Sequence, residues 1–369
     1  MDVVAVKFRP GLERRSYEIR IGHNLLEKVG EMIDVGRYSH VAVLTDETVS
    51  KCWLDTFKRG LPLPCPDIVI PCGEGRKDVE TLGYVWQRLQ SLGFDRKSLL
   101  FNLGGGVVGD LGGFAASSFM RGISFVQVPT TLLSQVDASV GGKVAVNHCG
   151  VKNLVGVFAQ PDLVIADLAV LQTLPQREFT AGLAEAIKHG VIADRRYFDF
   201  LSGKVGKKFT AEDLLYVVKR SCEIKAGIVE TDEDERGVRK ILNFGHTAGH
   251  AFESLSQRAF SGQAGALLHG EAVALGMLVA GEISVSMGLL SSHGADEIRT
   301  ALAAAGLPVT IEISCSLSGI LEQIRFDKKN VSGRINWTLI KAIGEPVFDV
   351  PVEEALVVRA LDAVLSQHG

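Results

Sequence analysis

The fold class follows from the stretch SLLFNLGGGVVGDLGGFAASSFM, residues 98–120. Its apolar start, 98–103, predicts a strand, and apolar residues at helical spacing over 108–120 predict a helix. The glycines between them fit the pattern GxGxxG at Gly104, Gly106 and Gly109. A glycine turn at a helix start lets backbone N–H groups meet a pyrophosphate. The alternative is a tight turn that only packs the helix on a sheet.

Strand-like and helix-like runs alternate through the first half of the chain. Further strands are expected at 40–45, 67–71, 124–129 and 163–167, and a further helix at 79–92. This alternation predicts an α/β domain with a mostly parallel, Rossmann-like sheet covered by helices on both faces. An opening pair, 3–8 and 16–21, predicts a hairpin added to that sheet.

The expected nucleotide site lacks one usual element. A standard Rossmann unit carries an acidic residue about 20 positions after its glycines, but residues 122–131 contain none. Asp46 instead follows the expected strand at 40–45, where it would reach a ribose from the end of a neighbouring strand. We therefore expect a strand order that differs from the usual Rossmann order.

The second half of the chain has a different texture. Long helix-like stretches occur at 181–192, 211–229, 244–255, 271–287 and 352–366, and only 335–343 looks strand-like. We place a boundary near Leu174 and Pro175. This gives a nucleotide-binding α/β domain over 1–174 and a mainly α-helical domain over 175–369, as expected for 369 residues at roughly 150 per domain.

Composition excludes several classes of protein. With 46% hydrophobic and 22% charged residues, the chain is neither disordered nor collagen-like. A net charge of −4 is not that of a nucleic-acid binder. The apolar run 272–281 is too short to cross a bilayer, and the first 20 residues contain no signal-peptide core. The six cysteines form no CxxC pair, so we expect free thiols in a reducing cytoplasm.

Histidines and a glutamate form a candidate metal site. His246 and His250 lie four residues apart, on one face of an expected helix, and His269 follows. Two histidines with Glu185 from another helix would suit zinc and leave one position for substrate or water. The alternative is a surface histidine pair that arose by chance. Thr247 stands where HExxH requires glutamate, which argues against a metalloprotease.

Several polar residues stand where an apolar core is expected. Lys225 continues the apolar stripe of Val218 and Ile228, and lysine is rarely buried without a partner. The alternative is that its side chain extends to the surface. Further candidates are Lys143, Lys152, Asn153, Arg239 and Asn243. Together they predict a pocket for a small, highly anionic substrate, because lysine and arginine are the usual partners of carboxylates and phosphates.

Six segments resemble the 3-dehydroquinate synthase family of the sugar phosphate cyclases. They are GGGVVGDLGGFAAS (104–117), RGISFVQVPTTLLSQVDASVGGKVAVN (121–147), KNLVG (152–156), GLAEAIKHG (182–190), LNFGHTAGHAFE (242–253) and HGEAVALGM (269–277). The resemblance covers nearly the whole chain. It implies that the N-terminal domain binds NAD and that the helical domain binds a divalent metal, zinc or alternatively cobalt.

The resemblance also assigns roles to individual residues. NAD contacts would be Asp46, Glu74, Lys77, Gly105, Gly106, Asp110, Thr130, Thr131, Lys143, Lys152, Thr173, Leu174 and Glu178. The metal ligands would be Glu185, His246 and His269. His250 would then contact substrate instead of metal.

The remaining roles concern the substrate. The catalytic set would be Asp137, Lys143, Lys188 and His250, with Asp137 and Lys188 on substrate hydroxyls. Lys225 and Arg239 would hold a carboxylate. The phosphate would lie among Lys143, Asn153, Asn243, His250 and Lys329, which is preferred to Lys328, and Lys152 would also contact substrate. Arg121 would complete the phosphate site of a neighbouring subunit, which implies a homodimer.

The family reaction converts 3-deoxy-D-arabino-heptulosonate 7-phosphate to 3-dehydroquinate and phosphate, in the shikimate pathway to aromatic amino acids. The resemblance implies that the metal polarises a substrate hydroxyl and that NAD takes a hydride and later returns it. Phosphate leaves between these two steps, and the opened sugar closes by an intramolecular aldol reaction. Cations around both anionic ends of the substrate suit an enzyme that positions reactants and stabilises charge.

Other activities remain open. Another sugar phosphate cyclase, such as a 2-deoxy-scyllo-inosose synthase, would act on a substrate without a carboxylate. Lys225 and Arg239 favour the dehydroquinate reaction, because a buried unpaired cation is costly. An NAD- and metal-dependent polyol dehydrogenase would release NADH and need no phosphate-binding lysines, and a non-catalytic NAD-binding scaffold would need no metal ligands. One departure from the family is the connector at 252–268, which is longer than usual.

Overall fold

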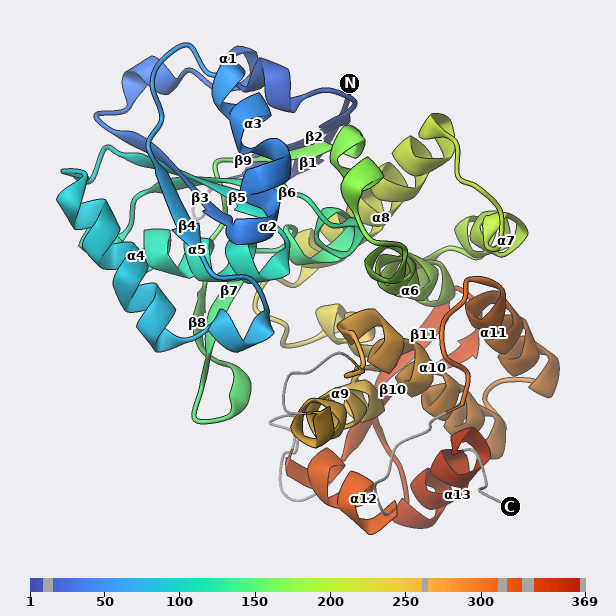
Figure 1. Cartoon of the computed structure of the whole chain (residues 1–369). Helices are drawn as coiled ribbons and strands as arrows, with labels where there is room; N and C mark the ends of the chain where they lie inside the picture. Colours follow the sequence, from blue (N-terminus) through green and yellow to red (C-terminus); the bar gives the residue numbers. More distant parts are fainter. Residues whose placement is uncertain (9–15, 261–264, 311–316, 327–334, 366–369) are drawn as a thin grey trace. The chain divides into compact units, whose positions relative to one another are not determined.

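The computed structural model describes residues 1–8, 16–260, 265–310, 317–326 and 335–365 (Figure 1). The chain forms two compact units. The first contains Met1–Pro175 and Ala211–Glu230, and the second contains Gln176–Thr210 and Thr231–Gly369. The helix α8 (Ala211–Thr231), which the expected boundary assigns to the helical domain, thus groups with the α/β unit.

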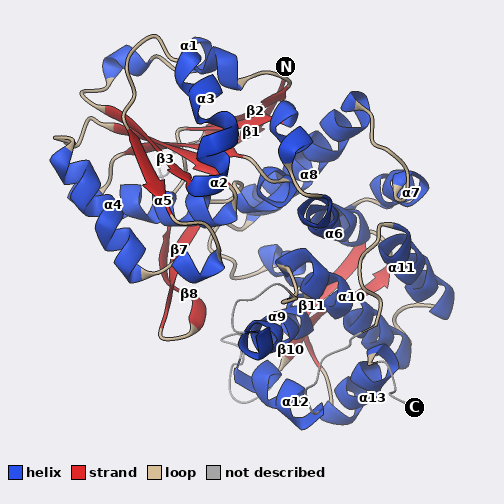
Figure 2. Cartoon of the chain, in the orientation of Figure 1, coloured by secondary structure: helices blue, strands red, loops and turns tan. Residues whose placement is uncertain are grey.

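The first unit is built on a seven-stranded sheet (Figure 2). Its strands are β1 (Asp2–Val6), β2 (Tyr17–Gly22), β3 (Val41–Asp46), β4 (Asp67–Ile70), β5 (Leu99–Gly104), β6 (Ser124–Pro129) and β9 (Leu163–Asp167). They are arranged in the order β1-β2-β9-β6-β5-β3-β4. Only β1 and β2 pair antiparallel, and all other neighbours are parallel. The structure therefore confirms the mostly parallel sheet and the added hairpin.

Helices cover both faces of this sheet. The helices α4 (Val79–Ser91) and α5 (Gly106–Ser118) lie on one face, and α1 (Val29–Met32) and α3 (Asp55–Arg59) lie on the other (Figure 1). Two adjacent residues of β5 show that side chains alternate between these two faces. Phe101 packs edge-on against Phe57 of α3, with ring centroids 5.1 Å apart, and Asn102 lies against Gly112 of α5. Because both faces are buried, these strands read as continuous apolar runs.

The strand order places a switch point at β3 and β5. From β3 the chain adds β4 on one side, then returns to add β5, β6 and β9 on the other. The sequence β4-β3-β5-β6-β9 is the doubly wound order 2-1-3-4-5 and not the usual Rossmann order, as expected. Ligands of such sheets bind beyond the carboxyl ends of the strands at this point. The carboxyl end of β3 is Asp46, and that of β5 is Gly104.

A two-stranded ribbon extends from the first unit. It consists of β7 (Lys143–His148) and β8 (Val151–Phe158), paired antiparallel. This ribbon was not predicted, because β8 is exposed along most of its length and its apolar residues therefore lack the one-sided alternation of a half-buried strand.

In the second unit, the other elements surround one central helix, α10 (His269–Ser286). This helix is apolar on nearly all sides, as expected for a buried helix, and it packs against α6, α9, α11, α13 and β10. The other elements are α6 (Gln176–Ala193), α7 (Arg195–Lys204), α9 (His246–Phe260), α11 (Ser292–Ala304), α12 (Leu317–Phe326), α13 (Glu354–Val364), β10 (Asn336–Ala342) and β11 (Glu345–Pro351).

One expectation for this unit is wrong. The strand at 335–343 is not the only one, because it pairs with β11, a strand whose prolines and partial exposure are not typical of a strand in the sequence. The helix expected at 244–255 continues to Phe260, so the first part of the connector at 252–268 is helical. Within the described part of the chain, no helix is long and apolar enough to span a membrane.

Candidate active site

The glycine turn joins β5 to α5 as the sequence predicts. Gly104 ends the strand, and Gly105 caps the helix without any side-chain hydrogen bond. A Cβ atom on Gly104 would lie 2.5 Å from the Cβ of Val108, so this position excludes larger residues. The first N–H groups of α5 therefore face the turn without a capping side chain, as an anion site at a helix N-terminus requires.

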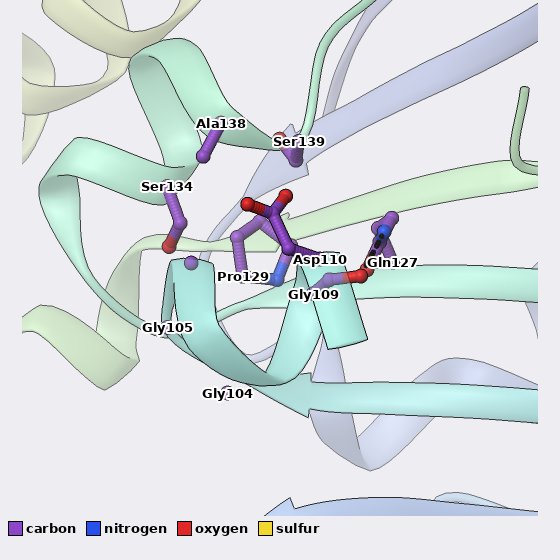
Figure 3. A pocket seen from close by; sticks show the side chains of 10 residues that line it. Gly104, Gly105, Gly109, Asp110, Gln127, Pro129, Ser134, Ala138 and Ser139 are labelled. Atoms are coloured by element: carbon purple, nitrogen blue, oxygen red, sulfur yellow. Dashed lines mark hydrogen bonds between the residues drawn. The ribbon is translucent and has the colours of Figure 1, made fainter. Parts of the chain in front are cut away.

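A small pocket lies beside this turn (Figure 3). It is lined by Gly104–Gly106, Asp110, Gln127, Ser134, Ala138 and Ser139, among others. The carboxylate of Asp110 points into it, towards the segment that carries Ser134, Ala138 and Ser139. Gly109, the third glycine of the pattern, is part of α5, and its carbonyl accepts a hydrogen bond of 3.0 Å from Nε2 of Gln127.

The strands beside β5 add further residues of the expected NAD site. Asp46 ends β3, and its Oδ1 accepts the N–H groups of Thr48 and Val49 at 2.8 and 2.9 Å. Thr130 follows β6, and its N–H donates to the carbonyl of Gly104 at 2.9 Å. The Thr131 hydroxyl is 2.8 Å from that of Ser134. Adjacent strands thus gather these residues at one edge, although Asp46 also serves as a helix cap.

Lys77 joins three segments of the first unit. This lysine is 4% exposed, and its Nζ contacts the Asp110 carboxylate and, at 2.6 Å, Oδ1 of Asn153. Burial raises the pKa of Asp110, and the charge of Lys77 opposes that rise. The cation therefore favours the charged form of this carboxyl group beside the glycine turn, against the effect of burial.

Asn147 is a linking residue that the sequence analysis missed. Its Nδ2 donates to Oε1 of Glu74 at 2.9 Å, and its Oδ1 accepts the N–H of Asn153 at 2.9 Å. Lys152 lies 3.9 Å from the same Glu74 oxygen. The expected residues Glu74, Lys77, Asp110, Lys152 and Asn153 therefore form one network, held together by the ribbon.

The remaining expected NAD residues are less concentrated. The Thr173 hydroxyl, at the end of the short helix Leu168–Thr173, accepts a hydrogen bond of 2.8 Å from Nε1 of Trp53. Leu174 follows it. Glu178 belongs to the second unit, in the first turn of α6, where burial raises its pKa and the charge of Arg177 opposes the rise.

Lys225 has a partner inside the first unit. Its Nζ lies 2.8 Å from Oδ1 of Asp137 and 2.6 Å from the Asp137 carbonyl oxygen. The side chain is buried as the apolar stripe predicts. Because the carboxylate balances the ammonium, the cost of an unpaired buried cation does not apply to Lys225. Lys143 begins β7 and is exposed.

The helices of the second unit bring together one carboxylate and two imidazoles. Oε1 of Glu185 in α6 lies 3.6 Å from Nε2 of His246 and 3.4 Å from Nε2 of His269. Glu185 is fully buried, whereas the His269 side chain is 29% exposed, so this group opens to one side. His250 is a neighbour, with its ring 5.2 Å from that of His246. The structure thus gathers His246 and His269 around Glu185, whereas the spacing in the sequence had paired His246 with His250.

The donor set suits a divalent cation such as zinc. The three ligand atoms lie within 4.8 Å of one another, and both rings present Nε2 towards the carboxylate. Each Nδ1 has its own partner: Glu253 Oε2 at 3.3 Å from His269, and the Phe244 carbonyl at 3.2 Å from His246. Such outer partners are typical of metal-binding histidines.

Charge is concentrated around this group. Burial lowers the pKa of His269, but the carboxylates of Glu253 and Glu185 outweigh it and raise that pKa to about 10. Lys188, one turn after Glu185, is buried and forms an ion pair with it. Three carboxylate or ammonium side chains around two imidazoles therefore make the group strongly polar inside an otherwise apolar unit.

Arg239 is held in a buried turn, the 3₁₀ helix Val238–Asn243. The residue is 1% exposed, and its Nη1 donates to the Glu233 carbonyl at 2.6 Å. Asp232 accepts the N–H groups of Arg236, Gly237 and Arg239 at 2.7–3.0 Å. Burial opposes ionisation of Asp232, but these hydrogen bonds hold its pKa below the usual range.

Two more predicted substrate residues are placed, and one is not. Nδ2 of Asn243 donates to Oε1 of Glu235 at 2.8 Å, a partner the sequence analysis missed. Arg121 is exposed after α5, in left-handed backbone with φ of 66°. Lys329 and its alternative Lys328 lie outside the described residues.

Comparisons with known proteins agree over most of the chain. The family model "3-dehydroquinate synthase N-terminal" matches residues 67–181, and "3-dehydroquinate synthase C-terminal" matches residues 182–330. A 3-dehydroquinate synthase from Thermodesulfovibrio yellowstonii is 42% identical over 346 residues, 92% of this chain and 94% of that protein.

Solved structures show the same relationship at lower identity. A 2-deoxy-scyllo-inosose synthase complexed with carbaglucose-6-phosphate, NAD+ and Co2+ matches with a TM-score of 0.87 and 25% identity, over 99% of this chain and 100% of that chain. A 2-epi-5-epi-valiolone synthase from Streptomyces hygroscopicus with NAD+ and Zn2+ bound gives the same TM-score and identity, over 97% and 99%. With two family models and a 42% identical relative in agreement, the chain belongs to the 3-dehydroquinate synthase family.

Proposed function

We propose that the chain converts 3-deoxy-D-arabino-heptulosonate 7-phosphate to 3-dehydroquinate and phosphate, with NAD and a divalent metal. The observation that carries this activity is 42% identity to a 3-dehydroquinate synthase over nearly the whole of both chains. The related 2-deoxy-scyllo-inosose synthase is only 25% identical. That difference favours the dehydroquinate reaction over the carboxylate-free cyclisation.

We assign NAD to the carboxyl ends of β3, β5 and β6. The switch point lies there, and α5 offers its N–H groups to a pyrophosphate. Asp46, Gly105, Gly106, Thr130 and Thr131 lie at these strand ends. The Lys77 network would close the opposite side of the turn with Glu74, Asp110 and Lys152. Thr173, Leu174 and Glu178 are assigned from the resemblance.

We assign a divalent metal to Glu185, His246 and His269, with zinc as the first candidate and cobalt as the alternative, because one carboxylate and two imidazoles suit both ions. When bound, the metal would polarise a substrate hydroxyl, and NAD would reversibly accept a hydride. The chain's own residues bind and orient the substrate. Lys188, fixed by Glu185, would donate to a substrate hydroxyl, and Asp137, fixed by Lys225, would accept from another.

The anionic ends of the substrate need fixed cations. Arg239 is held rigidly by Glu233 and Asp232, so it loses little freedom when it binds a carboxylate. We assign Arg239 and Lys225 to the carboxylate and Lys152 to a further substrate contact. The phosphate is assigned to Lys143, Asn153, Asn243, His250 and Lys329. Preorganised charge of this kind stabilises an elimination in which negative charge moves onto the leaving phosphate.

We also propose a cytoplasmic homodimer in which Arg121 reaches its partner's site. Arg121 is exposed next to Met120, and the ribbon carries further exposed apolar side chains, namely Val151, Leu154, Val155, Val157 and Phe158, each at least 40% exposed. Exposed apolar side chains of this kind favour an interface between subunits. None of the five cysteines that the structure describes forms a disulfide, which suits a reducing compartment.

Mixing two inactive variants tests the contribution in trans. Arg121→Ala and His269→Ala dimers, mixed and allowed to exchange subunits, would form heterodimers with one intact site. We expect activity to reappear in the mixture. Continued inactivity, with exchange verified by mass, would show that Arg121 does not act across subunits.

A substrate comparison tests the activity itself. We would offer the metal-loaded protein and NAD either the heptulosonate phosphate, a hexose phosphate without a carboxylate, or a polyol. Phosphate release from the first alone supports the proposal. Turnover of the hexose phosphate alone would indicate another sugar phosphate cyclase, and net NADH from the polyol would indicate a dehydrogenase.

A further inference from the structure

A buried carboxylate contacts one of the two metal-site histidines from behind. Glu253 is 4% exposed and lies on α9, seven residues after His246, so both face the same side of that helix. Its Oε2 lies 3.3 Å from Nδ1 of His269, which begins α10. The helices α9 and α10 pack directly against each other, so this contact joins two elements of the site.

The two histidines are supported unequally. Nδ1 of His246 faces the neutral carbonyl of Phe244 at 3.2 Å, whereas Nδ1 of His269 faces a carboxylate. A hydrogen bond donated by Nδ1 fixes the tautomer in which Nε2 carries the free electron pair. In His269 that nitrogen lies 3.4 Å from Oε1 of Glu185. A charged acceptor also makes the imidazole a stronger electron donor than a neutral acceptor does.

Burial of Glu253 argues against a merely incidental contact. A carboxylate in an apolar interior is unfavourable unless it is hydrogen-bonded or paired. His269 begins its helix and its side chain is 29% exposed, so the ring has solvent on one side, and Glu253 holds its Nδ1 edge in addition to the contact of Nε2 with Glu185. The carboxylate therefore limits the orientation of the ring as well as its tautomer.

We propose that Glu253 is a positioning residue for the metal site: it holds His269 through Nδ1 so that Nε2 is directed at the metal. This inference rests on the proposed assignment of the metal to Glu185, His246 and His269. Glu253 does not contact the metal itself. Its removal should weaken metal binding while leaving the three ligands in the chain.

The test compares zinc affinity in four variants by competition with a chromophoric chelator. Glu253→Ala should lose about 10- to 100-fold in zinc affinity. Glu253→Gln should lose less, because its amide oxygen can still accept from Nδ1 but carries no charge. His269→Ala gives the reference for loss of a ligand. Ser284→Ala is the control, because Ser284 is buried on the same helix and bonds to Ala280 and Ile340, far along the chain from His269.

Each outcome is informative. A graded loss from Glu253→Gln to Glu253→Ala, with Ser284→Ala unchanged, supports the inference. A change in the visible spectrum of Co2+-loaded Glu253→Gln would support it further. Equal zinc affinity in wild type and both Glu253 variants would overturn it. Failure of the wild type to bind zinc, or of His269→Ala to reduce binding, would instead overturn the proposed metal site. If Glu253→Ala does not fold, Glu253→Gln alone decides.

Discussion

Replacing Lys77 with methionine would leave a buried carboxylate without its cation. Lys77 is 4% exposed and the Asp110 side chain 19% exposed. Removing one partner of a buried pair costs about 3–5 kcal/mol, and the partial exposure of Asp110 places this case near the lower end. Loss of the 2.6 Å hydrogen bond to Asn153 adds about 1 kcal/mol. We expect the free energy of unfolding of the first unit to fall by about 3–4 kcal/mol.

Urea denaturation measures this change. With a slope of about 2 kcal/mol per molar, the midpoint should fall by roughly 1.5–2 M. Adding Asp110→Asn removes the stranded charge, so Lys77→Met with Asp110→Asn should be more stable than the sum of the single variants predicts, by at least about 1.5 kcal/mol. A Lys77→Met variant destabilised by less than about 1 kcal/mol, or strictly additive variants, would refute the role of Lys77 as the balancing charge.

The pH dependence gives a second check on the same pair. Burial already raises the pKa of Asp110 and Lys77 opposes the rise, so without the lysine this pKa rises further. The carboxyl group is then protonated at low pH in the folded state, where it needs no cation. The destabilisation by Lys77→Met should therefore shrink as the pH falls through the raised pKa and grow as the pH rises through it. A loss of stability independent of pH would contradict this reasoning.

Three further predictions concern the second unit. Asp232→Asn should lower the free energy of unfolding by about 2 kcal/mol at pH 7. Because hydrogen bonds lower the pKa of Asp232 in the folded state, its stabilisation is present above the unfolded-state pKa and is lost as the pH falls from there through the folded-state pKa. Urea titrations of the variant and the wild type should therefore converge in acid. Arg177→Ala should reduce zinc affinity severalfold, because Arg177 binds Glu271 through two hydrogen bonds of 2.7 Å at the start of the helix that carries His269. The control, Arg195→Ala, breaks a similarly exposed ion pair elsewhere in the unit and should leave zinc affinity unchanged. Equal effects of the two substitutions would contradict a specific role of Arg177 in supporting the metal site. Arg239→Ala should lower kcat/KM for the heptulosonate phosphate by about 10- to 100-fold, the loss of a charged hydrogen bond, with the NAD dissociation constant unchanged; undiminished kcat/KM would remove the carboxylate assignment.

Local sequence patterns predicted the buried strands and the glycine turn, because burial restricts which residues can occupy these positions. The strands β6 and β9 begin and end where the apolar runs do, since both faces of the sheet are covered. The glycine turn was predictable because the close contact between Gly104 and Val108 admits no side chain. The ribbon was not, because exposed β8 leaves no such pattern in the sequence.

Long-range pairing limited what could be predicted about the site. Spacing brought His246 and His250 together, but only the packing of α9 on α10 brings in His269, 23 positions further on. The partner of Lys225 is Asp137, 88 residues away, and no local rule connects them. Resemblance to a family supplied the ligand set, whereas supporting residues such as Glu253 and Asn147 emerged from the structure.

The most direct test is to follow phosphate, 3-dehydroquinate and NADH together in one reaction. Metal-loaded protein with the heptulosonate phosphate and a catalytic amount of NAD should release phosphate and 3-dehydroquinate in equal amounts, far exceeding the NAD supplied. NADH should not accumulate, and a chelator should abolish both products. Failure to turn over this substrate by protein that holds both NAD and metal, or NADH accumulating in proportion to product, would contradict the account.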